Sequence, residues 1–192
     1  MRGRTDVRRR ALFLASSMLA MIAVVSGAAQ TSNPCAETGL PISANDLIRT
    51  RFPGWRPKQL SDLPLDDRQI WLKEHANDCP GIAVGHFENA DRLTYALFLV
   101  RQSDPTNGYK LLVFDEMAQK NAYILKPLEQ ANGPTYGGVV IETAPPGHYS
   151  DYENARISVT TKLEGFYLEF IEKGAFLYYW SGRRYRTVRV SG

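Results

Sequence analysis

Short runs of apolar residues with a period of two follow one another along the second half of the chain, and this period is typical of β-strands. The first three runs, rich in β-branched and aromatic residues, span 82–87, 94–101 and 109–116. Both alternating faces of residues 94–101 are apolar, which predicts a central strand that is covered on both sides. Residues 104–108 (Asp-Pro-Thr-Asn-Gly) predict a hairpin between the second and third runs.

Residues 122–126 and 139–143 are candidates for further strands. The last third of the chain predicts a meander, with runs at 157–161, 166–171, 175–180 and 185–190. A two-residue turn at 181–182 is predicted between the last two runs, and Tyr179 would then lie opposite Arg184 across the ladder. We therefore expect a mainly antiparallel sheet of six to eight strands.

Two segments that precede the strands have helical spacing. Ser43 and Asp46 have the spacing of a capping box and begin the first segment, which Pro53 ends. A second helix is expected to begin at Asp66, with Gln69 three residues later as its partner in another capping box. Two N-terminal helices packed on a mainly antiparallel sheet define the expected fold class, α+β.

The first 29 residues have the parts of a secretory signal. Three arginines at 8–10 precede the apolar stretch 11–25, and small residues at 26–29 suit a cleavage site. The apolar stretch is shorter than the roughly 20 residues that span a bilayer. We expect residues 1–29 to be a signal peptide, residues 30–192 to form a single α+β domain, and the mature chain to be periplasmic or secreted without a stable membrane anchor. An uncleaved N-terminal anchor and export by the twin-arginine route stay open as alternatives.

The basic balance of the chain belongs to this leader. The whole sequence has 23 basic and 20 acidic residues, a formal net charge of +3. Removal of five arginines and Asp6 with the leader leaves 18 basic and 19 acidic residues, a net charge of −1. A polyanion-binding role loses its main support, so we expect no nucleic-acid partner.

The chain has two cysteines, Cys35 and Cys79, and both belong to the expected mature protein. A pair of cysteines in an oxidising compartment is usually bridged, so we predict a disulfide between them. Without a third cysteine, a zinc site with four thiolate ligands is excluded within one chain.

Residues 81–99 read as a strand, a loop with acidic and amide side chains, and a second apolar strand. This segment resembles a single degenerate FG-GAP or VCBS unit, as found in small exported bacterial proteins. In that family the loop aspartates bind calcium, because a hard cation takes several oxygen ligands from one tight turn. His86, Ala90 and Thr94 stand where three of these aspartates would be, so we expect neither calcium nor another metal.

Residues 143–154 form the longest stretch without strand or helix periodicity, and long loops in compact domains are often functional. His148 and Tyr149 are therefore candidate binding residues. Ser150 and Asp151 beside them suggest a hydrolase, although catalytic triads are assembled from distant segments. A small exported hydrolase that uses this loop is the alternative function.

Two other histidines and three glutamates have side chains that could take part in chemistry, but the sequence does not show which residues lie next to them. We interpret His75 as a surface residue late in the second helix and His86 as a strand-end residue. Glu142, Glu164 and Glu169 could pair as acid and base, but sequence separation does not give their distances.

The last hairpin alternates aromatic and arginine side chains, and no acidic residue follows Glu172. Arginine over aromatic faces is typical of protein interfaces. We therefore expect Tyr179, Arg184 and Arg186 to contact a partner. The alternative is an amphipathic hairpin whose arginines are simply solvated at a sheet edge.

These features predict an exported, non-enzymatic binding or interaction domain. An inhibitor and an immunity-type protein are two examples of such a domain. No catalytic set and no glycine-rich phosphate loop stand out, so no catalytic residue and no cofactor are expected. The expected partner is a protein or small ligand in the cell envelope or outside the cell.

Overall fold

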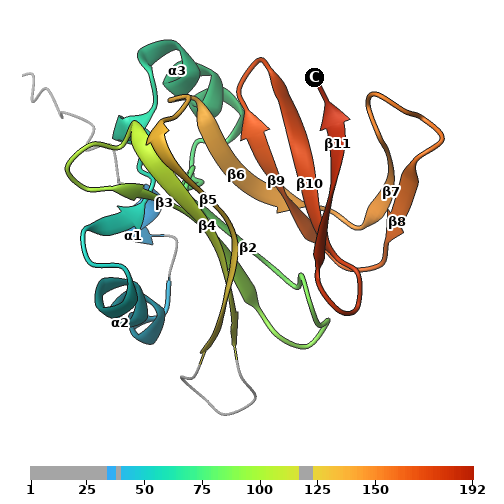
Figure 1. Cartoon of the computed structure of the whole chain (residues 1–192), viewed down its shortest axis with the longest axis horizontal. Coiled ribbons are helices and arrows are strands. Elements are labelled where there is room, and N and C mark those ends of the chain that lie inside the picture. The colour runs from blue at the N-terminus through green and yellow to red at the C-terminus, as the bar shows by residue number, and fades with distance from the viewer. Residues whose placement is uncertain (1–33, 38–39, 117–122) are drawn as a thin grey trace, which may run out of the picture. The chain divides into compact units, whose positions relative to one another are not determined.

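The computed structural model describes residues 34–37, 40–116 and 123–192 (Figure 1). These residues form eleven strands and only two ten-residue helices. These residues all belong to one unit, 32–192. The expected signal peptide, 1–29, lies outside them. Within the described ranges, none of the helices has the length and apolar character needed to cross a membrane.

The strands are divided among three antiparallel sheets. The first sheet holds β1 (Trp55–Pro57), β2 (Ile82–Gly85), β3 (Thr94–Arg101), β4 (Asn107–Glu116) and β5 (Tyr123–Pro134). The second holds β6 (Val139–Ala144), β9 (Gly165–Phe170), β10 (Gly174–Trp180) and β11 (Tyr185–Ser191). A two-stranded sheet is made by β7 (Gly147–Ser150) and β8 (Ser158–Thr161). The helical elements are α1 (Pro34–Glu37), α2 (Ile42–Arg51), the 3₁₀ turn η1 (Leu60–Asp62) and α3 (Leu65–Glu74).

Strand β3 is the centre of the first sheet, as its two apolar faces predicted. It pairs with β1, β2 and β4, and every residue of it except Arg101 is buried. One face, including Leu97 and Leu99, packs against α2 and β1. The other face, including Phe98 and Val100, packs against β6, β9 and β10 of the second sheet. The main core therefore lies between the two larger sheets.

The predicted α+β class, with one sheet of six to eight strands, was wrong. The described residues are 48% strand and 17% helical, and their strands form three sheets rather than one. The physical reason is that the second face of β3 is covered by another sheet and not by helices. Alternation shows that a face is buried, but it does not show which element buries it.

Both predicted helices are present, but both predicted capping boxes were wrong. Helix α2 follows Pro41 and α3 follows Pro64, with no side-chain hydrogen bond at either cap. A proline has a φ close to that of a helix, so it can lead the chain into the first turn. Ser43 and Asp46 consequently lie inside α2, where the Asp46 carboxylate pairs with Arg49.

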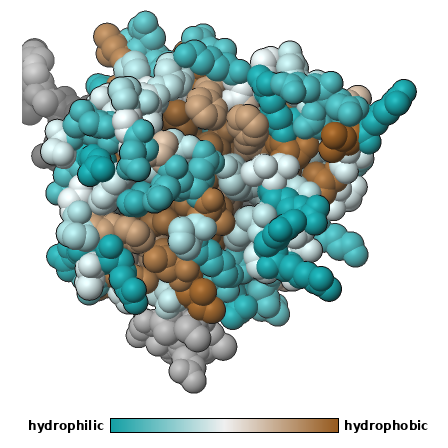
Figure 2. All heavy atoms as spheres, viewed as in Figure 1, coloured by the Kyte–Doolittle hydropathy of each residue, from teal (hydrophilic) through white to brown (hydrophobic). Residues whose placement is uncertain are grey.

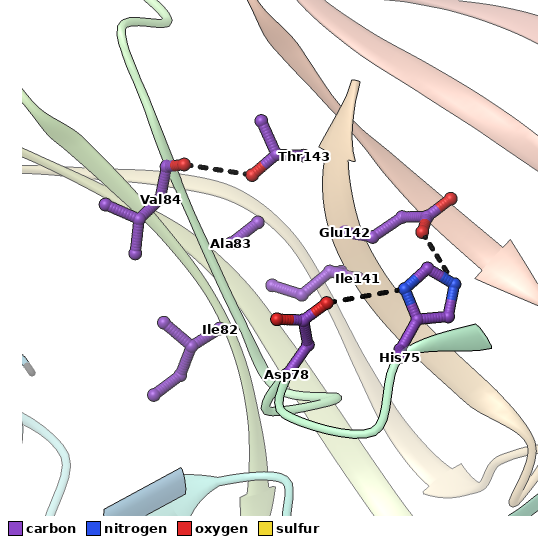
Figure 3. Close-up of a pocket in the computed structure, with 8 residues that line it drawn as sticks. All are labelled: His75, Asp78, Ile82, Ala83, Val84, Ile141, Glu142 and Thr143. Carbon is purple, nitrogen blue, oxygen red and sulfur yellow. Dashed lines mark hydrogen bonds and ion pairs between the residues drawn. The ribbon is translucent and has the colours of Figure 1, made fainter. Parts of the chain in front are cut away.

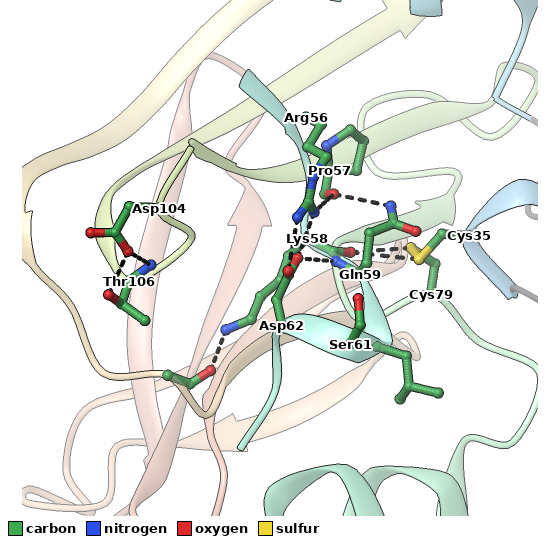
Figure 4. Close-up of polar contacts among 12 residues, drawn as sticks. Cys35, Arg56, Pro57, Lys58, Gln59, Ser61, Asp62, Cys79, Asp104 and Thr106 are labelled. Atoms are coloured by element: carbon green, nitrogen blue, oxygen red, sulfur yellow. Dashed lines mark hydrogen bonds and ion pairs between the residues drawn. A yellow bond between two sulfur atoms is a disulfide. The ribbon is translucent and has the colours of Figure 1, made fainter. Parts of the chain in front are cut away.

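A buried lysine lies beside the cysteine pair (Figure 4). Cys35 and Cys79 lie at disulfide distance, with Cα atoms 4.6 Å apart, as predicted. Both sulfur atoms lie 3.5 Å from the Lys58 carbonyl oxygen. The Lys58 side chain is buried, and its Nζ donates to the Gly137 carbonyl. Gly81 must be glycine here, because a Cβ would lie 2.4 Å from the Lys58 backbone nitrogen.

Candidate functional site

The last hairpin has a wider turn than the sequence predicted. Trp180 pairs with Tyr185, and Tyr179 pairs with Arg186, so residues 181–184 form the turn. The expected pairing of Tyr179 with Arg184 was therefore wrong by two residues. The backbone N–H and the hydroxyl of Ser181 both donate to the Arg184 carbonyl, at 3.0 and 2.7 Å, and these bonds close the wider turn.

This register still brings two of the predicted binding residues together. Tyr179 and Arg186 are direct neighbours across the ladder and share one face of the sheet. Arg184 lies in the turn, and both arginines are exposed, while Tyr179 is half-buried. The opposite face is used for packing: the Trp180 ring lies 5.3 Å from the Tyr185 ring, with the Lys126 ammonium 4.9 Å from the Trp180 centroid.

A groove of about 520 Å³ runs beside this turn, and we call it the hairpin groove. It is lined by residues 179–182 of the hairpin, residues 159–164 of β8 and the following loop, and Glu88. Tyr179 and Trp180 contribute aromatic residues to its lining from the hairpin, and Thr160 and Thr161 contribute to it from β8. The groove is thus built from segments that are far apart in the sequence.

Exposed cations lie in the lining of the hairpin groove (Lys162) and in the turn and strand that continue from it (Arg183, Arg184 and Arg186), and we call these four residues the basic rim. Across the part of the chain that the structure describes, none of these four takes part in an ion pair. Four arginines elsewhere in the described ranges form ion pairs, among them Arg56 with Asp62 and Arg189 with Glu153, and the other four do not. The basic rim therefore keeps its charge available for an external anion.

A buried polar cluster lies behind the groove. The side chains of Glu88 and Asp115 are 6% and 5% exposed, and the Lys126 ammonium contacts both carboxylates. Burial, followed by the nearby Glu88 carboxylate, raises the pKa of the Tyr185 hydroxyl. Lys126 thus supplies the positive charge between these two acids from within the chain. The second acid, Asp115, pairs across β3 and β4 with Thr94, whose hydroxyl is buried.

Residues 143–154 are not the irregular loop that the sequence predicted. Residues 147–150 are strand β7, which pairs with β8. His148 points outward, and its Nδ1 lies 3.0 Å from the Thr160 hydroxyl. Tyr149 points inward, 6.2 Å from the Tyr167 ring, in a small apolar cluster that also contains Tyr179. The structure therefore groups Tyr149 with Tyr179 and separates both from His148.

The polar residues that suggested a hydrolase, Ser150 and Asp151, contact residues that are close to them in the fold. The Asp151 carboxylate accepts hydrogen bonds from the backbone N–H groups of Glu153 and Asn154, at 3.0 and 2.9 Å. Ser150 lies opposite Ser158 in the β7–β8 ladder and is exposed. Among the described residues, His148 makes its side-chain hydrogen bond to Thr160 and none to Ser150 or Asp151, so no nucleophile and base are paired in this segment.

Sequence reasoning missed a second polar site, which is centred on His75. Its imidazole is not a free surface group, because it lies between Asp78 and Glu142. The only signal for this site in the sequence was the set of glutamates, including Glu142 and Glu169, that could pair as acid and base. Their proximity depends on the pairing of β6 with β9, which the sequence does not specify.

Comparison with protein-family models, with curated proteins and with solved structures gives no match. Residues 81–99 do form two antiparallel strands joined by a loop. Their resemblance to an FG-GAP or VCBS unit stays a prediction.

Proposed function

We propose that the mature chain is an exported, non-enzymatic binding domain that holds an acidic partner at the hairpin groove. The partner is a protein or small ligand of the cell envelope or the exterior that presents carboxylate or phosphate groups. An inhibitor or immunity-type role fits this description. Export is supported by the leader at residues 1–29 and by a cysteine pair at disulfide distance.

The observation that carries the proposal is the basic rim beside a groove whose lining includes aromatic residues. Guanidinium groups form paired, charge-assisted hydrogen bonds with carboxylates and phosphates. Tyrosine, tryptophan and arginine are also the residues most enriched where binding energy is concentrated. Tyr179 and Arg186 bring these two kinds of side chain together on one face.

The rest of the described surface supports recognition by charge rather than by a large apolar area. In the face drawn in Figure 2, apolar side chains gather in several separate groups between hydrophilic ones. The exposed large apolar residues lie on α2, on α3, before β3, on β5 and between β7 and β8: Ile42, Leu65, Leu72, Leu93, Ile124, Tyr152 and Ile157. Scattered exposed apolar residues are normal on a soluble surface and do not define an interface.

The test is capture of partners from envelope and culture extracts by the mature protein. The double variant Arg184→Ala/Arg186→Ala should capture the partner at least about tenfold more weakly, about 1.4 kcal/mol. Its free energy of unfolding should change by less than about 0.5 kcal/mol, since both side chains are exposed.

The matched control is Arg51→Ala/Lys73→Ala, which removes the same charge from exposed positions on α2 and α3. The control should capture the partner as the wild type does. Equal loss in both double variants would show a nonspecific effect of net charge. Undiminished capture by Arg184→Ala/Arg186→Ala would place the binding surface elsewhere.

A further inference from the structure

A second cavity lies where the first two sheets meet, between β2 and β6 (Figure 3). Its volume is about 320 Å³, and we call it the His75 pocket. One part of its lining is aliphatic, from residues 82–84 and Ile141. The other part is polar, from His75, Asp78, Glu142 and Thr143. None of these residues belongs to the hairpin groove, so the two sites are separate.

The imidazole of His75 is fixed in place by its neighbours. Its Nε2 lies 3.1 Å from a Glu142 oxygen, and its Nδ1 lies 3.5 Å from an Asp78 oxygen. The ring stacks on Trp71 with centroids 4.3 Å apart. Figure 3 shows Asp78 and Glu142 on either side of the ring, at the polar end of the pocket. Because both ring nitrogens face carboxylates, His75 positions these acids and is not itself available to a ligand.

The pocket has more negative than positive charge. Glu142 on β6 and Glu169 on β9 are diagonal neighbours on one face of the second sheet. Burial is the main cause that raises the pKa of Glu142, and the charges of Glu169, Asp78 and Glu74 add to it. Only His75 acts in the opposite direction. One imidazole, which contacts Asp78 and Glu142, is therefore the counterpart of these four carboxylates.

The pKa of Glu169 is raised by the same causes, with burial first and Glu74 adding to it. The remaining polar side chain of the lining has an internal role, because the Thr143 hydroxyl donates to the Val84 carbonyl at 2.9 Å. What the pocket offers to a ligand is thus carboxylate oxygen at one end and aliphatic surface at the other.

We propose that the His75 pocket binds a protonated primary amine on a short aliphatic stem. The ammonium group lies beside the imidazole at the polar end of the pocket, where it donates to the Asp78 and Glu142 oxygens that His75 does not contact and offsets the excess of negative charge. The stem packs against residues 82–84 and Ile141, in the way that amphipathic side chains lay their methylene groups on apolar surface. The site is selective for cations, whereas the hairpin groove is selective for anions.

The experiment is a titration of the mature protein with n-butylammonium chloride, followed by backbone amide chemical shifts. We expect saturable shifts at Asp78, Ala83 and Glu142, with a dissociation constant on the order of 1 mM. n-Butanol tests the stem without the charge, and sodium chloride tests ionic strength alone. A saturable response to either of these equal to that of the amine would overturn the proposal, as would the absence of saturation with the amine.

Two variants test the location of the site. Glu142→Gln should weaken amine binding at least about tenfold, about 1.4 kcal/mol. The matched control Asp66→Asn, an exposed carboxylate at the start of α3, should bind as the wild type does. If Glu142→Gln does not fold, Asp78→Asn replaces it with the same expected loss. Unchanged binding in the folded pocket variant overturns the proposal.

The same titration also tests the source of the amine and whether the His75 pocket is independent of the hairpin groove. Tighter binding of the peptide acetyl-Gly-Lys-Gly-amide than of n-butylammonium identifies a lysine side chain as the ligand group, and equal or weaker binding identifies a free amine. The variant Arg184→Ala/Arg186→Ala should retain the amine response in full. Loss of the response in that variant would show that the two sites are not separate, and would overturn the assignment to the His75 pocket.

Discussion

Lys58 is a buried residue whose ionisation the fold controls. Its side chain is 2% exposed, and burial lowers its pKa from 10.5 to about 8, although Asp62 and Asp67 partly offset this effect. Its ammonium group donates to the Gly137 carbonyl and lies 5.7 Å from the centroid of the Phe98 ring. A charged group in such surroundings makes folding less favourable than the neutral amine would.

The pKa shift of Lys58 predicts a stability that rises with pH. Between pH 8 and 10.5 the unfolded chain holds more protons on this residue than the folded chain does, so the free energy of unfolding increases by about 1.4 kcal/mol per pH unit. Lys58→Met should remove this rise in denaturant titrations between pH 8 and about 9.5. The upper limit avoids the range near pH 10 in which unfolded tyrosines ionise.

The control for this prediction is Lys73→Met, which replaces an exposed lysine of α3. This variant should keep the wild-type pH profile. Parallel profiles for the wild type and Lys58→Met would show that Lys58 is not the group responsible.

At the scale of elements, the strands were predictable because each carries its own alternation. β3 was predicted with its observed bounds, Thr94–Arg101, and as a central strand. β5 extends to Pro134, well past the predicted strand at 122–126, and includes Pro127. A proline is tolerated there because β5 lies at the edge of its sheet. The division into three sheets was not predictable, since it depends on contacts between distant segments.

The candidate sites were also predictable only where a local pattern along the chain determines them. Tyr179 and Arg186 share a face because side chains alternate along each strand, and a shift of two residues in the pairing keeps the same face. Arg184 was misplaced because the hydrogen bonds from Ser181 that widen the turn are not visible in the order of residues. The contact between His75 and Glu142 joins the end of α3 to β6, and no local pattern specifies it.

The cysteine pair links two segments that are far apart in the sequence. It joins α1 to the segment before β2 and closes a sequence separation of 44 residues. Replacing both cysteines by serine should lower the free energy of unfolding by about 2–4 kcal/mol, because the unfolded chain regains the freedom that the link removes. Urea titrations of the oxidised wild type and the double variant measure this difference.

Reduction provides the control for the cysteine pair. A reductant should destabilise the wild type by a similar amount and leave the double serine variant unchanged. Mass spectrometry under non-reducing conditions should find Cys35 linked to Cys79 in the exported protein. Two alkylatable thiols in that material would contradict the prediction.

At the scale of the whole molecule, the distribution of charge matters more than its total. The expected mature chain carries a net charge of only −1, from 18 basic and 19 acidic residues. The basic rim of Lys162, Arg183, Arg184 and Arg186 nevertheless gathers four cations without ion pairs among the described residues. The His75 pocket gathers carboxylates on other elements. A nearly neutral protein can thus present local fields of opposite sign, each of which attracts a different group.

This separation of charge predicts how salt affects capture of the acidic partner. Exposed charges are screened over about 8 Å at physiological ionic strength and over shorter distances at higher salt. Raising the salt concentration from about 0.05 M to about 0.5 M should therefore weaken capture by the wild type several-fold, mainly through slower association. Arg184→Ala/Arg186→Ala should show a shallower dependence on salt, while Arg51→Ala/Lys73→Ala should keep the wild-type slope. Capture that is insensitive to salt in all three proteins would mean that the partner is held by apolar contacts, with the arginines of the hairpin serving only as a solvated sheet edge.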